Sequence, residues 1–425
     1  MAGETIEAVD AREILDGRLE PTLRVEVVTS GGSVGRADVP HGRSRGANEA
    51  VEVRDGGERY RGQGVSRAVR NVTEVIAPEL SGLSVTRQRT VDERLVTLDG
   101  TDDRSNLGAN ALTGVSLATL QAGAASVGLP LYRYVGGVDA SLLPIPFFDM
   151  IEGGELAESG LDFQEHQVVP IGTNSFESAL RKSAEVYYEL GDLLKDEWGA
   201  SSLNVGDEGG YTPPMDDAHD ALDAELRAIE RLGYDDEFGL ALDAAATHLY
   251  DLESETYQYG GEDLTWDELF DVYGELAETF PIVSIEDPLY EEDLSGFARL
   301  ADRLDVQIVG DDLFATDPAR VARAVDLGAA NALLLKVNQV GTVSEAMDAM
   351  AAAVDAGYGV QVSERSGQTP DSWLAELTVG LGAGQIKTGV TRSERVEQYN
   401  RLLEIEAELG GAASYPAWSA VRGGR

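Results

Sequence analysis

The chain has 425 residues, among which 76 Asp and Glu oppose 33 Lys and Arg, for a formal net charge of −43. A surface of that sign repels nucleic acid and anionic membranes, so neither is expected as a partner. The length allows one large domain with a second, smaller one. The chain contains no cysteine, which excludes disulfides, thiolate metal sites and thiol nucleophiles.

The acidic residues are spread among well-patterned apolar segments, which favours a solvated acidic shell over a disordered acidic tail. Such a shell suits a salt-rich cytoplasm, where high ionic strength screens self-repulsion. Only four of the 33 basic residues are lysines, and two of these, Lys336 and Lys387, directly follow apolar runs. The N-terminus is acidic, and no apolar run approaches the ~20 residues that span a bilayer. We therefore expect a soluble cytoplasmic protein.

Residues 1–138 have the pattern of a small α+β domain. Val25 and Val27 alternate with charged residues, and a glycine-containing turn at 30–33 leads into a second apolar run, as in a β-hairpin. A glycine loop with two arginines follows at 40–46. Residues 65–80 and 110–127 have helical patterns, and glycines and prolines between 136 and 146 indicate a junction.

Residues 139–425 contain apolar runs that recur at a regular spacing, and most of them end in a residue that can do chemistry. In chain order these end residues are Asp243, Glu286, Asp311, Lys336, Glu364 with Arg365, and Lys387. The later spacings each accommodate one strand, one helix and two loops. This predicts a parallel (β/α)₈ barrel with an active site at the C-terminal strand ends.

The segments between these runs read as helices. Thr265 begins a capping box, and Pro318 stands where a first helical turn tolerates proline. Met347, Met350 and Val354 are spaced to form one apolar face. Each predicted helix therefore lies between two charged strand ends.

Asp243, Glu286 and Asp311 follow three successive predicted strands, so three carboxylates are expected to converge from one direction. Converging carboxylates repel one another unless a cation lies between them. Oxygen ligands without cysteine or a histidine cluster suit Mg²⁺. The alternative for any one of these acids is a helix cap.

Lys336 and Lys387 are expected to face this metal site. An ammonium beside a second cation, partly desolvated, has a lowered pKa and acts as a base near neutral pH. Glu165 and Glu208 would approach from the other side as an acid and its support. Together these groups suit abstraction of a proton α to a carboxylate, followed by loss of a β-hydroxyl. The alternative for either lysine is a pair with a neighbouring acid.

Eight segments in order resemble signature segments of the enolase (phosphopyruvate hydratase) family, and the resemblance extends from about residue 5 to 408. They are 11–16 (AREILD), 98–101 (LDGT), 107–111 (LGANA), 205–210 (VGDEGG), 284–288 (SIEDP), 310–313 (GDDL), 335–339 (LKVNQ) and 385–389 (QIKTG). The resemblance implies a carbon–oxygen lyase with an N-terminal α+β domain, an enolase-type barrel, one or two Mg²⁺ per subunit and a homodimeric or larger assembly. A halophilic paralogue within that family is a possible reading.

By that resemblance, Lys336 removes the C2 proton of 2-phosphoglycerate, and Glu208 assists loss of the C3 hydroxyl. Glu165 supports Glu208, and Lys387 neutralises the substrate carboxylate. The implied substrate contacts are Gln164, Glu165, Arg365, Ser366 and Lys387, with Arg43 and Arg45 added from the glycine loop. The implied metal ligands are Asp243, Glu286 and Asp311, with Ser44 reaching a second Mg²⁺.

Four departures from the family pattern lie at the substrate-facing rim. The first loop reads HGRSRG at 41–46, an Asn-Gly-Gly becomes Glu152-Gly-Gly, and two histidines are replaced by Leu156 and Glu364. A carboxylate at 364 would repel a substrate phosphate unless a cation offsets it. Arg43 and Arg45 are the expected source of that cation.

Three hypotheses follow. The first is a working enolase of a high-salt cytoplasm, acting on 2-phosphoglycerate. The second is a diverged enzyme that abstracts the α-proton of another hydroxy-carboxylate and dehydrates it, as Leu156 and Glu364 suggest. The third is a non-catalytic binding or scaffold role, which leaves Lys336 unexplained among so few lysines.

Overall fold

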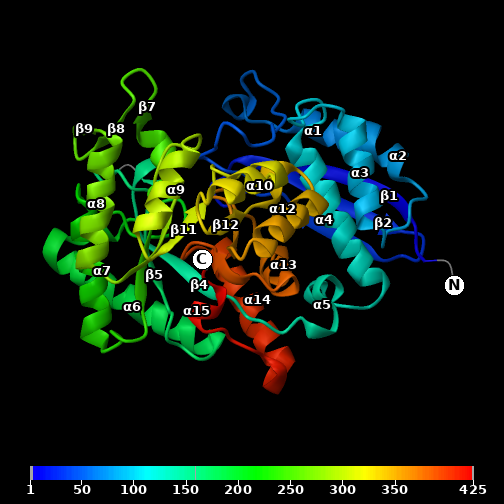
Figure 1. The fold of residues 1–425 in the computed structure, drawn as a ribbon. Coiled ribbons are helices and arrows are strands. Elements are labelled where there is room, and N and C mark those ends of the chain that lie inside the picture. The colour runs from blue at the N-terminus through cyan, green and yellow to red at the C-terminus, as the bar shows by residue number, and fades with distance from the viewer. Residues whose placement is uncertain (1–2, 158, 424–425) are drawn as a thin grey trace.

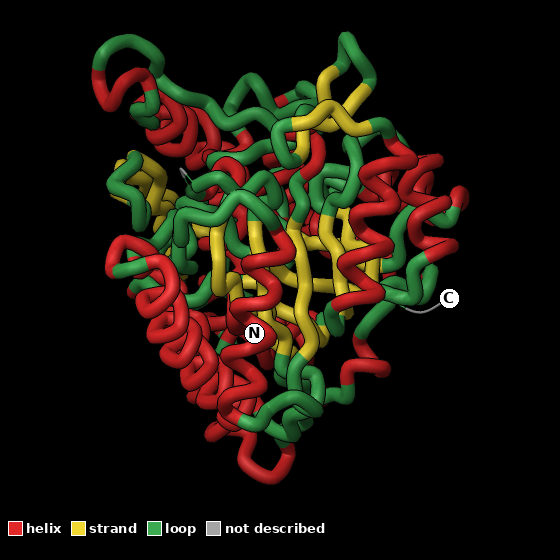
Figure 2. The backbone as a smooth tube through the Cα atoms, turned by 90° about the vertical axis from the view of Figure 1, so that its left-hand side faces the viewer, coloured by secondary structure: helices red, strands yellow, loops and turns green. Residues whose placement is uncertain are grey.

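The computed structural model describes residues 3–157 and 159–423. A three-stranded sheet with its helices forms the N-terminal part, at the right of Figure 1, and a closed eight-stranded barrel forms the rest. Seen from the side, the barrel strands lie inside a layer of helices (Figure 2). The expected combination of an α+β part and a (β/α) barrel is confirmed.

The N-terminal sheet consists of β1 (Ile6–Leu15), β2 (Pro21–Thr29) and β3 (Val34–Asp38), all antiparallel. The predicted hairpin is confirmed, with Val28 opposite Val34 across the turn. Helix α4 (Ala109–Ser126) packs on this sheet and is buried along most of its length. Gly35 lets the helix approach, because a Cβ at this position would lie 2.1 Å from the Ala118 carbonyl oxygen.

The other N-terminal helices cover the same side of the molecule. They are α1 (Ser66–Arg70), α2 (Ala77–Leu80), α3 (Gln88–Asp99) and α5 (Leu131–Gly136). A π-helical segment, Asn71–Ile76, joins α1 to α2, so the helical pattern expected over 65–80 is present with one wider turn inside it.

The barrel strands follow one another around the closed sheet in the order β4-β5-β6-β10-β11-β12-β13-β14. Their bounds are β4 (Ile145–Glu152), β5 (Glu165–Val169), β6 (Gly239–Asp243), β10 (Ile282–Glu286), β11 (Gln307–Gly310), β12 (Ala332–Leu335), β13 (Gly359–Ser363) and β14 (Gly384–Lys387).

The prediction of an all-parallel barrel is wrong for one strand. Strand β5 runs antiparallel to both β4 and β6. Residues 153–164 join β4 to β5, and the described part of this link contains only the short 3-10 helix Gly154–Leu156. Without a crossover helix the chain returns in the opposite direction. The first residue of β5, Glu165, therefore lies at the same barrel end as the last residues of the parallel strands.

Helices surround the barrel, and a small three-stranded sheet projects beside it at the upper left of Figure 1. The helices are α6 (Phe176–Trp198), α7 (Ala218–Leu232), α8 (Trp266–Thr279), α9 (Leu294–Arg303), α10 (Pro318–Leu327), α11 (Val337–Val340), α12 (Val343–Asp355), α13 (Trp373–Leu381), α14 (Ser393–Leu409) and α15 (Trp418–Val421). The projecting strands are β7 (Tyr250–Asp251), β8 (Thr256–Tyr259) and β9 (Glu262–Leu264).

The sequence signals for helix ends hold in two helices. Thr265 and Glu268 form a reciprocal capping box at the start of α8. Pro318 begins α10, after the capping side chain of Asp317, and Gly328 ends that helix in the left-handed conformation.

The predicted apolar face of α12 is confirmed only at Met350, which packs against the core. Met347 and Val354 are 38% and 50% exposed. The buried face is instead lined by small residues, including Ala346, Ala349 and Ala353. Alanine brings the helix closer to its neighbours than longer side chains allow, and Met347 and Val354 turn outward.

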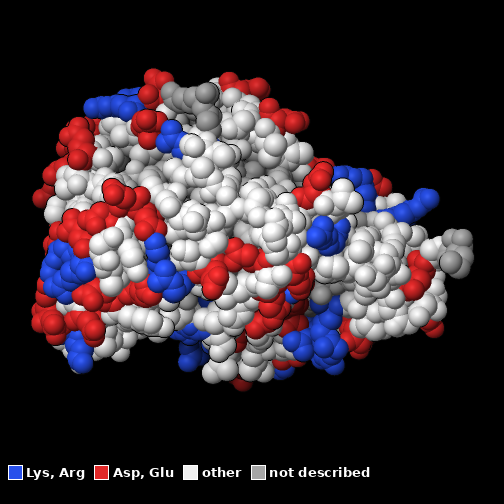
Figure 3. All heavy atoms as spheres, turned by 90° about the horizontal axis from the view of Figure 1, so that it is seen from below, with Lys and Arg blue, Asp and Glu red and all other residues white. Residues whose placement is uncertain are grey.

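Acidic side chains are prominent on the surface. Figure 3 shows Asp and Glu in separate patches, most extensive at the left of the view, with Arg and Lys beside them. In the described part of the chain no single helix has the length and apolarity needed to cross a bilayer. Only the segments Ala109–Ser126 and Leu131–Asp139, bent by 86° relative to each other, reach that length and composition as a pair.

The close approach of β3 to α4 gives a stability prediction. Gly35→Ala would force the helix from the sheet, and overpacking of this kind costs about 1–3 kcal/mol. We expect a clearly lower thermal unfolding midpoint by circular dichroism. Gly274→Ala in α8 is the matched control, because a Cβ there meets nothing within 4 Å. Its midpoint should rise, since alanine favours a helix over glycine. Equal midpoints for both variants would contradict the packing described.

Candidate active site

The C-terminal ends of the barrel strands meet the glycine loop 40–46 around one small pocket. Most of the residues that the sequence singled out contribute to its wall. The pocket is lined by Gly42, Ser44, Gln164, Glu165, Glu208, Asp243, Lys336, Ser363, Glu364, Arg365, Ser366 and Lys387. Chemistry-bearing groups from both parts of the chain are thus brought together.

Lys387 occupies the centre of the acidic wall. Its Nζ atom lies 3.0 Å from Asp243 Oδ2, 2.8 Å from Glu286 Oε2 and 3.0 Å from Glu165 Oε2. The three carboxylates come from neighbouring strands in register, with Asp243 opposite both Glu165 and Glu286. Burial disfavours the ammonium, yet these carboxylates raise the pKa of Lys387 well above its ordinary value.

Lys336 follows β12 and points to the next acid around the barrel. Its Nζ atom lies 2.5 Å from Asp311 Oδ2, and the Gln339 side-chain amide donates to Asp311 Oδ1 at 2.7 Å. The lowered pKa expected for Lys336 is not found. Although burial acts against the charge, the attraction of Asp311 raises the pKa of Lys336. In return, Lys336 lowers the pKa of Asp311 despite its burial.

The convergence predicted for Asp243, Glu286 and Asp311 is partial. Asp243 and Glu286 share Lys387, whereas Asp311 turns to Lys336. Among the described residues, the acidic sets with ligand oxygens all within 4.8 Å are Asp149/Glu165/Glu208 and Asp287/Asp311/Asp312, not this trio. The trio still suits Mg²⁺ by donor chemistry, because it offers carboxylate oxygens from adjacent strand ends and Glu286 Oε1 is buried without a partner.

Arg365 is held in place before any ligand binds. Its two terminal nitrogens each donate to Glu49 at 2.9 Å, and further bonds reach Ser44 O and Asn338 Oδ1. Ser366 Oγ accepts from the Arg43 backbone N–H at 2.8 Å. The expected anion-binding pair, Arg365 and Ser366, is therefore joined to the glycine loop from which Ser44 comes.

The arginines of the glycine loop do not offset Glu364. Arg43 pairs with Asp207 at 3.1 Å, and Arg45 pairs with Glu49 at 3.5 Å. The expectation that these two supply the missing cation is wrong. Arg43 is paired with an acid of the turn that carries Glu208, and Arg45 with an acid that follows its own loop.

Arg395 of α14 supplies that cation instead. Its NH1 atom lies 3.0 Å from Glu364 Oε2, and both side chains are buried. Its other bonds go to the backbone carbonyl oxygens of Asp207, Ser366 and Arg365. Sequence reasoning missed Arg395 because it lies inside a helix, far along the chain from Glu364 and away from any strand end.

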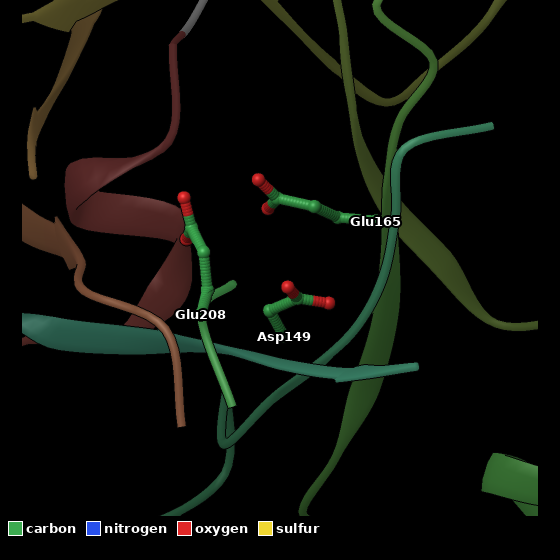
Figure 4. A group of neighbouring side chains, drawn as sticks. All are labelled: Asp149, Glu165 and Glu208. Atoms are coloured by element: carbon green, nitrogen blue, oxygen red, sulfur yellow. The ribbon is translucent and has the colours of Figure 1, made fainter. Parts of the chain in front are cut away.

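Asp149 is a second residue that the sequence analysis missed. It belongs to β4, is 0% exposed, and neither carboxylate oxygen has a hydrogen-bond partner. Figure 4 shows Asp149, Glu165 and Glu208 pointing toward one another. Burial, and then the charge of Glu165, raises the pKa of Asp149 well above its ordinary value. Burial likewise raises the pKa of Glu165 to about 8, although Lys387 opposes the shift. The sequence signal that could have identified Asp149 is its position as an acid inside the apolar run 145–151.

Glu152 fixes the glycine turn that carries Glu208. Its Oε1 atom accepts the Gly210 N–H at 2.5 Å, and both of its oxygens accept the Glu208 N–H at 3.2 Å. The carbonyl oxygen of the buried Leu156 accepts a further hydrogen bond from the Asp207 N–H. Glu152 and Leu156, two of the four departures from the family pattern, therefore hold the turn that carries Glu208. Neither of them offers a free polar group to the pocket.

Comparisons with known proteins agree with this arrangement. The family model described as "Enolase, N-terminal domain" matches residues 6–135, and the one described as "Enolase, C-terminal TIM barrel domain" matches residues 140–422. A protein named enolase from Methanopyrus kandleri is 56% identical over 415 residues, covering 96% of this chain and 97% of its own. Enolases from Thermococcus kodakarensis and Pyrococcus furiosus are each 52% identical, with 96% of both chains covered.

The buried pair of Arg395 and Glu364 gives a second prediction. Arg395→Met leaves Glu364 buried without its cation, and breaking a buried pair in this way costs about 3–5 kcal/mol. Thermal unfolding should show a large loss of stability near neutral pH. The loss should shrink at acid pH, because protonated Glu364 carries no charge.

The double variant Arg395→Met/Glu364→Gln tests whether the charge is responsible. It should recover part of the lost stability, but not all, because the carbonyl contacts of Arg395 stay absent. A double variant no more stable than Arg395→Met would contradict this reading.

Proposed function

Because the chain belongs to the enolase family, we propose that it catalyses the reversible dehydration of 2-phosphoglycerate to phosphoenolpyruvate, the enolase reaction of glycolysis. The observation that carries the proposal is the single pocket that gathers Lys336, Glu208, Glu165, Lys387 and Arg365. The full-length similarity to proteins named enolase supports the same reaction.

In this proposal the substrate is fixed at its two anionic ends. Arg365 and Ser366 bind the phosphate, with Arg43 and Arg45 adding positive charge from the loop. Lys387 neutralises the charge of the substrate carboxylate, and the side-chain amide of Gln164 contacts the substrate from the opposite wall of the pocket. The pre-formed bonds of Arg365 support such a role, because an oriented guanidinium loses little freedom on binding an anion.

The proton transfers are assigned to opposite walls. Lys336 takes the proton from C2, and the electron pair left behind forms an enediolate with the substrate carboxylate. The C3–O bond then breaks, and the departing hydroxide takes a proton from Glu208 to leave as water. Glu165 supports Glu208 and is itself held by Lys387 at 3.0 Å. General acid and base groups of this kind each contribute roughly 10²–10⁴-fold.

Asp243, Glu286 and Asp311 are proposed to hold one Mg²⁺, and Ser44 to reach a second. A metal held there would supply positive charge that stabilises the enediolate, and Asp311, as one of its ligands, would no longer pair with Lys336 alone. That change removes the main attraction that keeps Lys336 protonated. In this proposal Lys336 carries a charge in the described arrangement, loses it when the metal is bound, and then accepts the C2 proton.

Nothing in the comparisons favours a different hydroxy-carboxylate as substrate. Glu364, which suggested one, has its own cation in Arg395. Its charge is therefore offset within the protein and does not require an altered ligand.

We further propose that the protein is a cytoplasmic homodimer in a salt-rich cell. The net charge of −43 supports the salt-rich cell, and the family's usual assembly supports the homodimer.

The roles of base and acid can be separated by isotope exchange. Lys336→Ala should lose both phosphoenolpyruvate formation and exchange of the C2 proton with D₂O, by roughly 10²-fold or more. Glu208→Gln should lose dehydration to a similar degree but retain C2 exchange, because Lys336 is intact. Proton NMR of 2-phosphoglycerate in concentrated KCl with Mg²⁺ measures both.

Lys195→Ala is the control for this experiment, since Lys195 is an exposed lysine of α6. It should match the wild type in both measurements. A folded wild-type protein that forms no phosphoenolpyruvate would reject the proposed reaction. Retained C2 exchange in Lys336→Ala would reject Lys336 as the base.

The metal assignment is tested by Glu286→Gln. Loss of one of three carboxylates should weaken Mn²⁺ binding by roughly tenfold or more, because affinity follows the charge of the ligand set. Electron paramagnetic resonance of free Mn²⁺ gives the affinity without substrate. Glu278→Gln, on the exposed side of α8, is the matched control and should bind as the wild type does. Equal affinities in the two variants would remove Glu286 from the ligand set.

A further inference from the structure

Glu364 lies beside Glu208, the proposed acid. Its Oε2 atom is bonded to Arg395 at 3.0 Å and to the Thr388 hydroxyl at 3.1 Å, but Oε1 is buried without a partner. Glu208 Oε2 is also buried without a partner. The two residues meet at Gly389, where a Cβ would lie 2.9 Å from Glu364 Oε1 and 3.1 Å from Glu208 Cβ.

The surroundings of this pair are rich in negative charge. The acidic groups facing it from β4 and β5 are Asp149, Glu152 and Glu165, and the cations facing it are Arg395 from α14 and Lys387 from β14. Lys387 is already shared among three other carboxylates. In the described part of the chain no hydrogen-bond donor reaches either free oxygen. Two facing carboxylates in such a site cannot both be ionised without a large cost.

We propose that Glu364 is a positioning residue that shares a single proton with Glu208 and so keeps the proposed acid protonated. This inference rests on the assignment of Glu208 in the proposed function. The proton lies between Glu364 Oε1 and Glu208 Oε2, the two oxygens that lack a donor. Arg395 binds the remaining Glu364 oxygen, so the negative charge of the pair is held on the side away from the substrate.

The proton count through the reaction is balanced. Before dehydration the pair holds one proton and one negative charge. Transfer of that proton from Glu208 to the departing hydroxide gives water and leaves the pair with two negative charges, beside Arg395. The pair then regains one proton from solvent when product leaves. Burial and the neighbouring charge of Glu208 both raise the pKa of Glu364, which agrees with a retained proton.

Infrared spectroscopy of the full-length protein detects this proton without substrate. Glu364→Gln and Glu208→Gln are each compared with the wild type at mildly alkaline pH, by the carbonyl band of a protonated carboxylic acid. Each variant should lose one acid band, and it should be the same band, because one proton serves both residues. In Glu208→Gln the like charge beside Glu364 is gone while its contact with Arg395 remains, so Glu364 is expected to ionise.

Glu225→Gln is the matched control for detection and for activity. Glu225 is 0% exposed on α7, both of its oxygens lack partners, and burial alone raises its pKa. This variant should lose an acid band of its own and leave turnover unchanged. It shows that the method sees a buried protonated glutamate and that a buried Glu→Gln change does not by itself alter the pH profile.

The pH dependence of kcat provides the functional readout. In Glu364→Gln the like charge is gone and Arg395 is freed, so Glu208 loses its proton more easily. The alkaline limb of the profile should move to lower pH by about one unit, with a loss of ~10-fold in kcat at mildly alkaline pH. KM for 2-phosphoglycerate should change far less than kcat.

Three results would overturn the inference. They are persistence in Glu208→Gln of the band that Glu364→Gln removes, an alkaline limb that does not move in Glu364→Gln, and an appearance of that band in the wild type only after Mg²⁺ is chelated. The last would mean that a cation separates the carboxylates. Failure of the proposed function is distinct, because a wild type without enolase activity can still show the shared band. Should Glu364→Gln not fold, Glu208→Gln tests the same proton.

Discussion

The buried ammonium of Lys387 is the interaction on which the mouth of the barrel depends. It is 3% exposed and binds carboxylates from three adjacent strands, β5, β6 and β10. Without it, three acids in register would face one another in a site that excludes water, and each would either take a proton or be displaced. The geometry of the pocket is therefore built on a charge balance in which one buried cation, Lys387, is shared by three carboxylates.

Positions at strand ends were predictable from the sequence, whereas partners across the site were not. Asp243, Glu286 and Lys387 stand where apolar runs stop, and a barrel brings such ends together whatever the details of packing. The pairing of Lys336 with Asp311 depends on side-chain rotation, which no spacing encodes. Arg395 lies in a helix, and only the three-dimensional fold shows that it faces Glu364.

The direction of β5 illustrates the same limit at the level of the backbone. An apolar run reads alike in either direction, so the run after Glu165 predicted a strand but not its orientation. The link 153–164 decides it, since a parallel neighbour usually needs a crossover helix, and the described part of this link contains only the short 3-10 helix Gly154–Leu156. The consequence reaches the chemistry. An antiparallel β5 brings its first residue, not its last, to the functional end of the barrel.

Glu208, the proposed acid, is coupled to the glycine loop through its neighbour in the chain. Asp207 pairs with Arg18 and Arg43, and its carbonyl oxygen accepts from Arg395. Arg43 in turn bonds Ser366 through its backbone N–H, so the loop, the anion-binding residues and the acid's turn form one connected network. Displacement of the loop would break the contact between Arg43 and Asp207 and would loosen the turn that aims Glu208. In the proposed reaction, a loop held in this arrangement would position Glu208 and the proposed phosphate contacts together, which would couple binding to the step that needs the proton.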